Sequence, residues 1–268
     1  MAETPIVSVI MGVYNTNNEN MLRLAIDSIL NQTLSNIEFI ICDDGSIDGT
    51  YETLIRLYGK YKNIVIIRNK ENSGLAKTLN NCLKIAKGKY IARMDADDIS
   101  NIDRLKIQME FLEEYKEYSF VGCCSLLFND NCIWGERKTK ENPDKEDFLF
   151  GTPFIHPTIM MRKEVYEALN GYKVSKLTRR AEDYDLFMRA YAKGFKGYNI
   201  QQNLYSFRED NNAYKRRAYK HRLEEAKVRY YGFKELNLLP KGYIYILKPI
   251  IVGLIPQKIL SIFRNEKK

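Results

Sequence analysis

Three aspartates that directly follow an apolar run are the residues best suited to chemistry. Asp95, Asp97 and Asp98 come after Tyr90–Met94, whose composition is typical of a buried strand. Side chains two residues apart in an extended chain point to the same side, so Asp95 and Asp97 can present two carboxylates together. Such hard oxygen ligands suit Mn²⁺ or Mg²⁺, which takes further ligands from water and substrate phosphates. A cation there would stabilise a departing diphosphate.

A second acidic pair, Asp43 and Asp44, ends the apolar run Ile37–Cys42. Either cluster has a plain structural alternative, because aspartates mark turns after strands and Asp97 or Asp98 could cap a following helix. Two clusters at equivalent strand ends are harder to explain in this way, since like charges packed together repel unless a cation or proton relieves them. Their repetition favours a ligand site.

Asp183 lies beside Glu182 at the start of a helical pattern that we expect over residues 184–192. Acids in a first helical turn ordinarily complement the helix dipole or cap the helix. The functional alternative is a general base that removes a proton from an attacking hydroxyl. The sequence alone leaves both interpretations open.

These acids can act together only if strands and helices bring them to the same edge of a sheet. Strand and helix patterns alternate through the first hundred residues, which favours a parallel sheet with ligands beyond the carboxyl ends of its strands. The second half is less regular, and we expect a polar, loop-rich stretch at 129–147. We expect strands at 6–11, 37–42, 64–67, 90–94, 119–127 and 158–161, and helices at 21–30, 51–58, 75–86, 104–115, 163–169 and 184–192.

The net charge of +8 comes from the end of the chain. Residues 211–268 hold 14 Lys and Arg against 4 Asp and Glu, whereas residues 1–210 hold 28 against 30. With no internal repeat or low-complexity linker, we expect one catalytic domain over 1–210 and an appended basic tail over 211–268. Within the tail we expect a helix at 213–234. Its basic and aromatic residues could bind single-stranded nucleic acid. Because no recognised nucleic-acid motif accompanies them, we expect no nucleic-acid partner.

The apolar segment 242–255 is too short for a conventional membrane span. Apolar residues beside cations indicate a segment that lies on an anionic membrane surface. The alternative is a C-terminal subdomain packed on the body with a solvated basic face. The five cysteines are odd in number, form no Cys-x-x-Cys, and accompany only two histidines, so we expect a reduced, cytoplasmic protein without a zinc site.

Several short strings, in order along the chain, resemble family 2 glycosyltransferases. One such string would be a weak signal, but their order makes the resemblance specific, and it extends from about residue 6 to residue 208. The strings are VSVIMGVYN at 7–15, SILNQT at 28–33, ICDDGS at 41–46, NSGLA at 72–76, GKYIARMDADD at 88–98, RL at 104–105, HPTIM at 156–160 and AEDYDL at 181–186.

The resemblance implies an α/β GT-A fold, in which helices flank a Rossmann-like, mostly parallel sheet. It divides the catalytic domain into a nucleotide-binding half, 1–100, and an acceptor half, 101–210. It implies inverting transfer of a hexosyl or N-acetylhexosaminyl group from a nucleotide donor, usually UDP-linked, to a hydroxyl of a glycan or lipid-linked acceptor. A tail on the membrane would place the enzyme at the inner face of the cell membrane.

The resemblance also assigns roles to residues. Tyr14, Asp44, Lys77, Arg93 and Asp95 match nucleotide-sugar contacts.

Asp95 and Asp97 match the family's DxD pair near a Mn²⁺ or Mg²⁺ ion. Asp183 matches the catalytic base. Asp98, His156, Glu182 and Arg208 are expected near the acceptor or the diphosphate, although a histidine before proline is also commonly a packed loop residue.

Three other functions are weighed against this one. A nucleotide-sugar-binding protein without catalysis would not need every expected acid. A metal-dependent nucleotidyltransferase would need a phosphate loop near the first strand, and none is seen. A dehydrogenase would need the Gly-x-Gly-x-x-Gly fingerprint, whereas Gly12 stands alone after the first strand.

Overall fold

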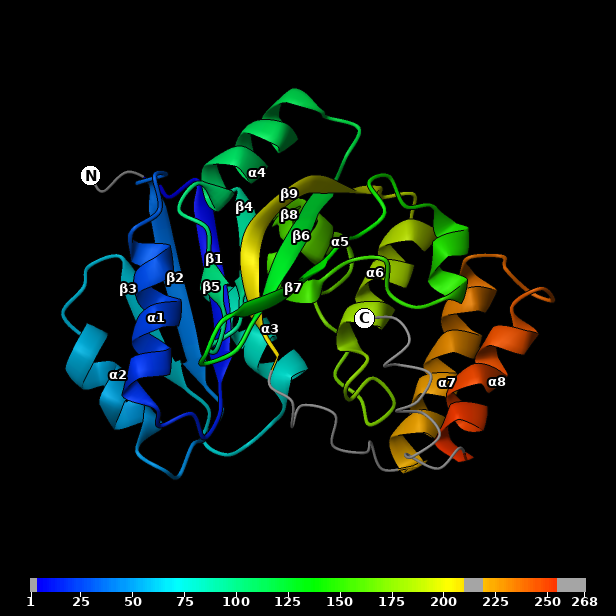
Figure 1. Ribbon diagram of the computed structural model, residues 1–268, viewed down its shortest axis with the longest axis horizontal. Helices are drawn as coiled ribbons and strands as arrows, with labels where there is room; N and C mark the ends of the chain where they lie inside the picture. The colour runs from blue at the N-terminus through cyan, green and yellow to red at the C-terminus, as the bar shows by residue number, and fades with distance from the viewer. Residues whose placement is uncertain (1–3, 210–218, 255–268) are drawn as a thin grey trace.

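The computed structural model describes residues 4–209 and 219–254 (Figure 1). Within them, nine strands form one sheet in the order β3-β2-β1-β4-β8-β6-β9-β5, with β7 paired to β6. The expected α/β class is confirmed. The amino-terminal half consists of β1 (Val7–Val13), α1 (Glu19–Leu30), β2 (Ile37–Asp43), α2 (Thr50–Tyr58), β3 (Ile64–Arg68), α3 (Leu75–Ile85) and β4 (Tyr90–Met94).

These first four strands are parallel, as their alternation with helices predicts. The register pairs Val13 of β1 with Asp43 of β2, and Met11 of β1 with Met94 of β4, so the strands end near one edge. Both faces are buried, and side chains alternate between two cores with the period of two expected in a strand. The acids that follow β2 and β4 are thereby brought to the same edge of the sheet.

Helices cover both faces of the sheet (Figure 1). One core contains the buried faces of α1, α2 and α4 (Arg104–Glu114), and the other contains those of α3, α5 (Lys163–Ala168) and α6 (Glu182–Ala192). Helix α1 shows how the sequence specifies this packing, since Leu22, Ala25, Ile26 and Ile29 recur at helical spacing and are all buried.

A buried polar network links the beginnings of β1, β2 and β4. The Ser8 hydroxyl donates to Glu38 at 2.5 Å, and the backbone N–H groups of Lys87 and Gly88 donate to Glu38 and Ser8. Gly88 approaches β1 so closely that a Cβ atom there would lie 2.4 Å from the Ser8 nitrogen. Only glycine fits this approach of backbone to backbone.

The carboxyl-terminal half extends the sheet with mixed directions. Strand β8 (Met160–Arg162) is antiparallel to β4, β6 (Phe120–Phe128) is antiparallel to β8, and β9 (Gly197–Arg208) is parallel to β6. Short β5 (Ile99–Ser100) pairs with β9.

Two expectations for this half need correction. The stretch 129–147, expected to be loop-rich, contains β7 (Ile133–Arg137), and β9 was not expected at all. Both strands contain polar and exposed residues, and their apolar pattern is therefore weak.

The basic tail contributes two described helices, α7 (Tyr219–Glu235) and α8 (Tyr243–Leu254). Val228 and Phe233 of α7 share a core with Phe187 of α6, so α7 packs on the body of the protein. The boundary expected at 210–211, residues 213–218 of the expected helix, and residues 255–268 lie outside the described part of the chain. No helix within the described residues combines the length and apolar character required to cross a bilayer.

Candidate active site

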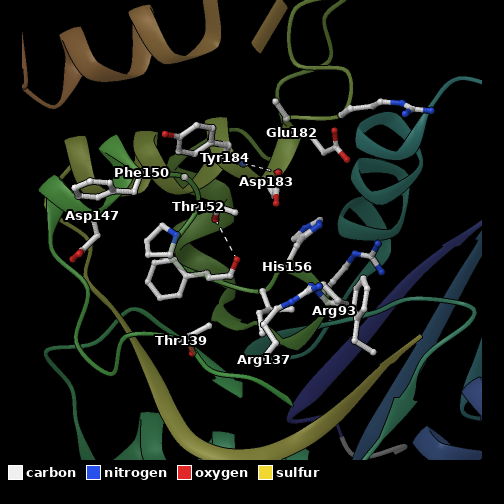
Figure 2. A pocket seen from close by; sticks show the side chains of 18 of the residues that line it. Arg93, Arg137, Thr139, Asp147, Phe150, Thr152, His156, Glu182, Asp183 and Tyr184 are labelled. Carbon is white, nitrogen blue, oxygen red and sulfur yellow. Dashed lines mark hydrogen bonds between the residues drawn. The ribbon is translucent and has the colours of Figure 1, made fainter. Parts of the chain in front are cut away.

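A cavity of about 950 Å³ opens between the end of β4 and the start of α6. Arg93 and Asp95 line it on one side, and Glu182 and Asp183 on the other. The loop 150–157 and residues 137–140 form further walls. Figure 2 shows Asp183 and His156 directed into the same space, with Arg93 close to His156. The sheet thus brings together acids that stand almost ninety residues apart.

At the end of β4, Arg93 is buried and holds Asp95. Its Nη2 lies 2.5 Å from Oδ1 of Asp95, and its Nη1 donates to the Met94 carbonyl. The Asp95 backbone N–H donates to the Tyr205 hydroxyl at 3.2 Å. Asp95 keeps about a third of its side chain exposed at the cavity, whereas Arg93 is almost fully enclosed. Arg93 therefore orients the Asp95 carboxylate, and its own guanidinium stays enclosed by protein rather than projecting into solvent.

Asp97 and Asp98 lie on the turn that follows, outside the residues that line the cavity. Asp97 is exposed and Asp98 is buried. Oδ1 of Asp98 accepts the Arg208 backbone N–H at 2.7 Å. Burial, with the charges of Asp95 and Asp97, raises the pKa of Asp98 well above its ordinary value.

Arg208 secures this turn with its side chain. Its Nε donates to the Asp97 carbonyl at 3.0 Å, and its Nη1 lies 2.5 Å from Asp130. Its guanidinium also covers the ring of Phe128 at 4.7 Å. In this structure Arg208 contacts the Asp97–Asp98 turn and does not line the cavity.

The turn has donor chemistry that suits a divalent cation. No cluster of three or more His, Cys, Asp or Glu side chains within residues 4–209 and 219–254 is arranged to hold a metal ion. However, Asp95 and Asp97 offer carboxylates, and Oδ2 of Asp98 is buried without a hydrogen-bond partner. Mg²⁺ and Mn²⁺ commonly bind one or two carboxylates and complete their shell with water and phosphates. The residues present fit a cation of that kind.

Asp183 lies in the first turn of α6, which begins two residues earlier than expected. Its Oδ1 accepts the backbone N–H of Tyr184 at 2.8 Å. Burial and the charge of Asp183 raise the pKa of neighbouring Glu182 to about 7. The Tyr184 hydroxyl donates to the Phe148 carbonyl and fixes the start of the helix against the segment that leads to the loop 150–157.

His156 lines the cavity, and hydrogen-bonded tyrosines orient its ring. Its Nε2 shares a hydrogen bond of 2.8 Å with the Tyr172 hydroxyl, which lies 3.2 Å from the Tyr166 hydroxyl. Burial and then the charge of Arg93 hold the pKa of His156 well below its ordinary value. His156 is therefore a neutral, oriented imidazole at neutral pH.

The remaining predicted residues lie outside this cavity, Tyr14 and Asp44 at the carboxyl ends of β1 and β2 and Lys77 on α3. Tyr14 is 45% exposed after β1, and Lys77 is exposed in the first turn of α3. Asp44 is buried and accepts the backbone N–H groups of Ser73 and Gly74 at 2.8 Å each. Asp44 thus anchors the start of α3, and the structure does not bring these three residues to Asp183.

Sequence reasoning missed the contribution of the tail to this cavity. Glu225 and Arg229 of α7 line it. Arg229 is buried, donates to the Leu149 carbonyl at 3.1 Å and lies over the Tyr184 ring at 5.2 Å. Glu225 and Arg229 are an acid–base pair four residues apart on a helix, a readable signal, but this spacing is also common on solvated helices.

Comparisons with known proteins agree with this architecture. The family model described as glycosyl transferase family 2 matches residues 8–169. The chain is 42% identical to "Putative glycosyltransferase EpsE" of Bacillus subtilis (strain 168), with 100% of this chain and 96% of the relative covered. It is 26% identical to the UDP-Gal:alpha-D-GlcNAc-diphosphoundecaprenol beta-1,3-galactosyltransferase of Escherichia coli, with 97% and 98% covered.

Among solved structures, S. aureus TarS 1-349 in complex with UDP-GlcNAc superposes with a TM-score of 0.70 at 17% identity, covering 94% of this chain and 76% of that one. At such identity the likeness concerns the fold, which is GT-A. Together with the family model and the relatives, it establishes that the chain belongs to glycosyl transferase family 2 and is a glycosyltransferase.

Proposed function

We propose that this glycosyltransferase moves a hexosyl or N-acetylhexosaminyl group from a UDP-sugar to a hydroxyl of a glycan or lipid-linked acceptor, with inversion at the anomeric carbon. One observation carries the proposal: a single cavity is lined by Asp95, from the DxD turn, and by Asp183, from α6. A UDP donor is supported by the UDP-GlcNAc complex of TarS. A lipid-linked acceptor is supported by the E. coli relative, which is named for its diphosphoundecaprenol-linked acceptor.

Asp183 is the proposed base. Its carboxylate takes the proton of the acceptor hydroxyl as that oxygen attacks the anomeric carbon from the face opposite the diphosphate. The new carbon–oxygen bond forms while the bond to the diphosphate breaks, and the electron pair leaves with UDP. A single displacement inverts the configuration. Neutral His156 offers a hydrogen bond to the acceptor or diphosphate, and we place Glu182 near the acceptor.

Asp95 and Asp97 would hold Mn²⁺ or Mg²⁺, which supplies charge stabilisation for the leaving diphosphate when bound. Arg93 keeps Asp95 in place, and Arg208 and Asp98 keep the turn in shape. We assign Tyr14, Asp44 and Lys77 to the nucleotide. Tyr14 and Asp44 lie at the carboxyl ends of β1 and β2, where ligands bind in such sheets, and Lys77 lies in the first turn of α3.

We further propose that residues 1–210 form the catalytic domain, with the nucleotide-binding half at 1–100 and the acceptor half at 101–210, and that residues 211–268 attach it to the inner face of the cell membrane. Helix α8 supports the attachment, because Tyr243, Ile244, Leu247 and Ile251 are each at least half exposed. Lys248 lies on the same helix. An exposed apolar stripe beside cations suits an anionic bilayer surface.

Flotation with vesicles of phosphatidylglycerol and phosphatidylcholine tests this attachment in the full chain. Ile244→Asp combined with Leu247→Asp should abolish flotation, whereas Leu24→Asp, at an exposed position of α1, should not. Equal flotation of both variants would exclude α8 as the membrane contact.

The activity itself is tested with a panel of nucleotide sugars. Purified full-length protein is supplied with Mn²⁺ or Mg²⁺, and nucleotide release is measured with and without lipid-linked acceptors. We expect UDP release from one or two UDP-sugars that rises when the acceptor is added. Release of a nucleoside monophosphate or of pyrophosphate would instead indicate nucleotidyl transfer, and binding without release would indicate a non-catalytic protein.

A further inference from the structure

Basic side chains line the cavity at six positions, all within the described part of the chain. Five of them are already paired with acids of the protein, so their charge is compensated before any substrate binds. The pairs are Arg93–Asp95 at 2.5 Å, Arg137–Glu209 at 3.3 Å, Lys138–Glu136 at 3.4 Å, Lys140–Asp147 at 2.7 Å and Arg229–Glu225 at 3.1 Å.

Arg180 is the sixth. Within the described residues its guanidinium has neither a hydrogen-bond nor an ion-pair partner, although it lines the same cavity as Glu182 and Asp183, and its backbone interacts with the Glu182 carboxylate. Its side chain is exposed. A guanidinium so close to two acids in sequence, yet paired with neither, keeps its full set of side-chain donors available to a ligand.

The backbone at Arg180 is strained. Its φ is +67°, in the left-handed region that glycine adopts freely and that a residue with a Cβ adopts at a cost. A backbone hydrogen bond closes the turn that contains Arg180, because the Ala181 N–H donates to the Thr178 carbonyl at 2.8 Å. Residues held in such conformations concentrate at functional sites. Stability alone would favour glycine or asparagine at this position.

We propose that Arg180 binds a phosphate group of a bound substrate. The guanidinium fork matches phosphate oxygens bidentately, which a lysine cannot do. The inference rests on the proposed function, and the position of Arg180 three residues before the base indicates the source. In a single displacement the base works on the acceptor side and the leaving diphosphate lies opposite, so a phosphate carried by the acceptor is the expected ligand.

Calorimetry with two probes separates the sources. UDP with Mg²⁺ reports the donor side, and inorganic pyrophosphate added to UDP-saturated protein reports a second phosphate site. Arg180→Gln should weaken pyrophosphate binding roughly tenfold and leave UDP binding within twofold. Weakened UDP binding would instead assign Arg180 to the donor diphosphate. Unchanged binding of both probes would overturn the proposal, and neither measurement depends on turnover.

Two further variants exclude a merely structural role. Arg179→Gln removes the same charge from an adjacent exposed residue outside the cavity and should leave both affinities unchanged. Arg180→Gly relieves the strained backbone, so its melting temperature should equal or exceed that of the wild type while pyrophosphate binding falls. A lower melting temperature, or equal loss of binding in Arg179→Gln, would contradict a phosphate contact at Arg180.

Discussion

The amino-terminal half, β1–β4 with α1–α3, is ordered by backbone pairing between parallel strands, whereas the side of the cavity that carries Asp183, the proposed base, is held by side chains. Parallel strands set the positions of Asp44 and Asp95 through their register. Asp183 depends instead on the Tyr184 hydroxyl and on Arg229, which fix neighbouring carbonyls at Phe148 and Leu149. We therefore expect substitutions in the amino-terminal half and substitutions around Asp183 to differ in their effects on stability and activity.

The largest effect is expected at the DxD turn. Asp95→Asn removes a carboxylate that lines the cavity and the partner of buried Arg93, so transfer should fall by roughly hundredfold or more. Titration of Mn²⁺ against the transfer rate should show a higher half-saturating concentration. Asp103→Asn, a half-buried aspartate immediately before α4, is the control. Unchanged metal dependence in Asp95→Asn would contradict the assignment.

Next in size is a packing effect in the amino-terminal half. Gly88→Ala would place a Cβ 2.4 Å from the Ser8 nitrogen, and the backbone of β1 cannot move away easily. We expect a loss of about 1–3 kcal/mol in the free energy of unfolding, measured by urea denaturation. Gly135→Ala in β7 meets only Leu127 at an ordinary 3.5 Å and should be nearly neutral. Equal losses in the two variants would remove the contrast between the halves.

A smaller effect is expected where α7 meets the cavity. Arg229→Gln frees the Leu149 carbonyl and loosens the loop 150–157 relative to Asp183, so turnover with acceptor should fall roughly tenfold while UDP affinity stays constant. Lys227→Gln removes the same charge from an exposed position on α7. If Lys227→Gln lost as much turnover, general charge rather than Arg229 would account for the effect.

The smallest effect concerns pH. The pKa of Glu182, about 7, lies above its ordinary value because of burial and Asp183, so the folded state binds this proton more tightly than the unfolded state. Stability is therefore lost as pH rises through 7. Glu182→Gln has no such loss, and its melting temperature relative to wild type should be higher at pH 8 than at pH 5. The same difference at both values would exclude a raised pKa.

The difference between the amino-terminal half and the surroundings of Asp183 also explains which features could be predicted from the sequence. The strands β1–β4 are short apolar runs that alternate with helices of clear period, and the ends of β2 and β4 carry the acids directly. The walls of the cavity come from residues 137–140, 150–157 and α7, which are far apart in sequence and meet only through packing. Nothing local in Arg229 or Phe150 indicates that they share a cavity with Asp183. The strand β9 escaped prediction because Gln201, Gln202 and Asn203 interrupt its apolar pattern.

The central claim is that Asp183 is the base in a cavity shared with the donor. The most direct measurement compares Asp183→Asn with the wild type in two assays: UDP binding by calorimetry and sugar transfer with saturating donor and acceptor. We predict UDP affinity within twofold of the wild type and a transfer rate lower by a factor of roughly a hundred or more. A transfer rate close to that of the wild type would contradict the account.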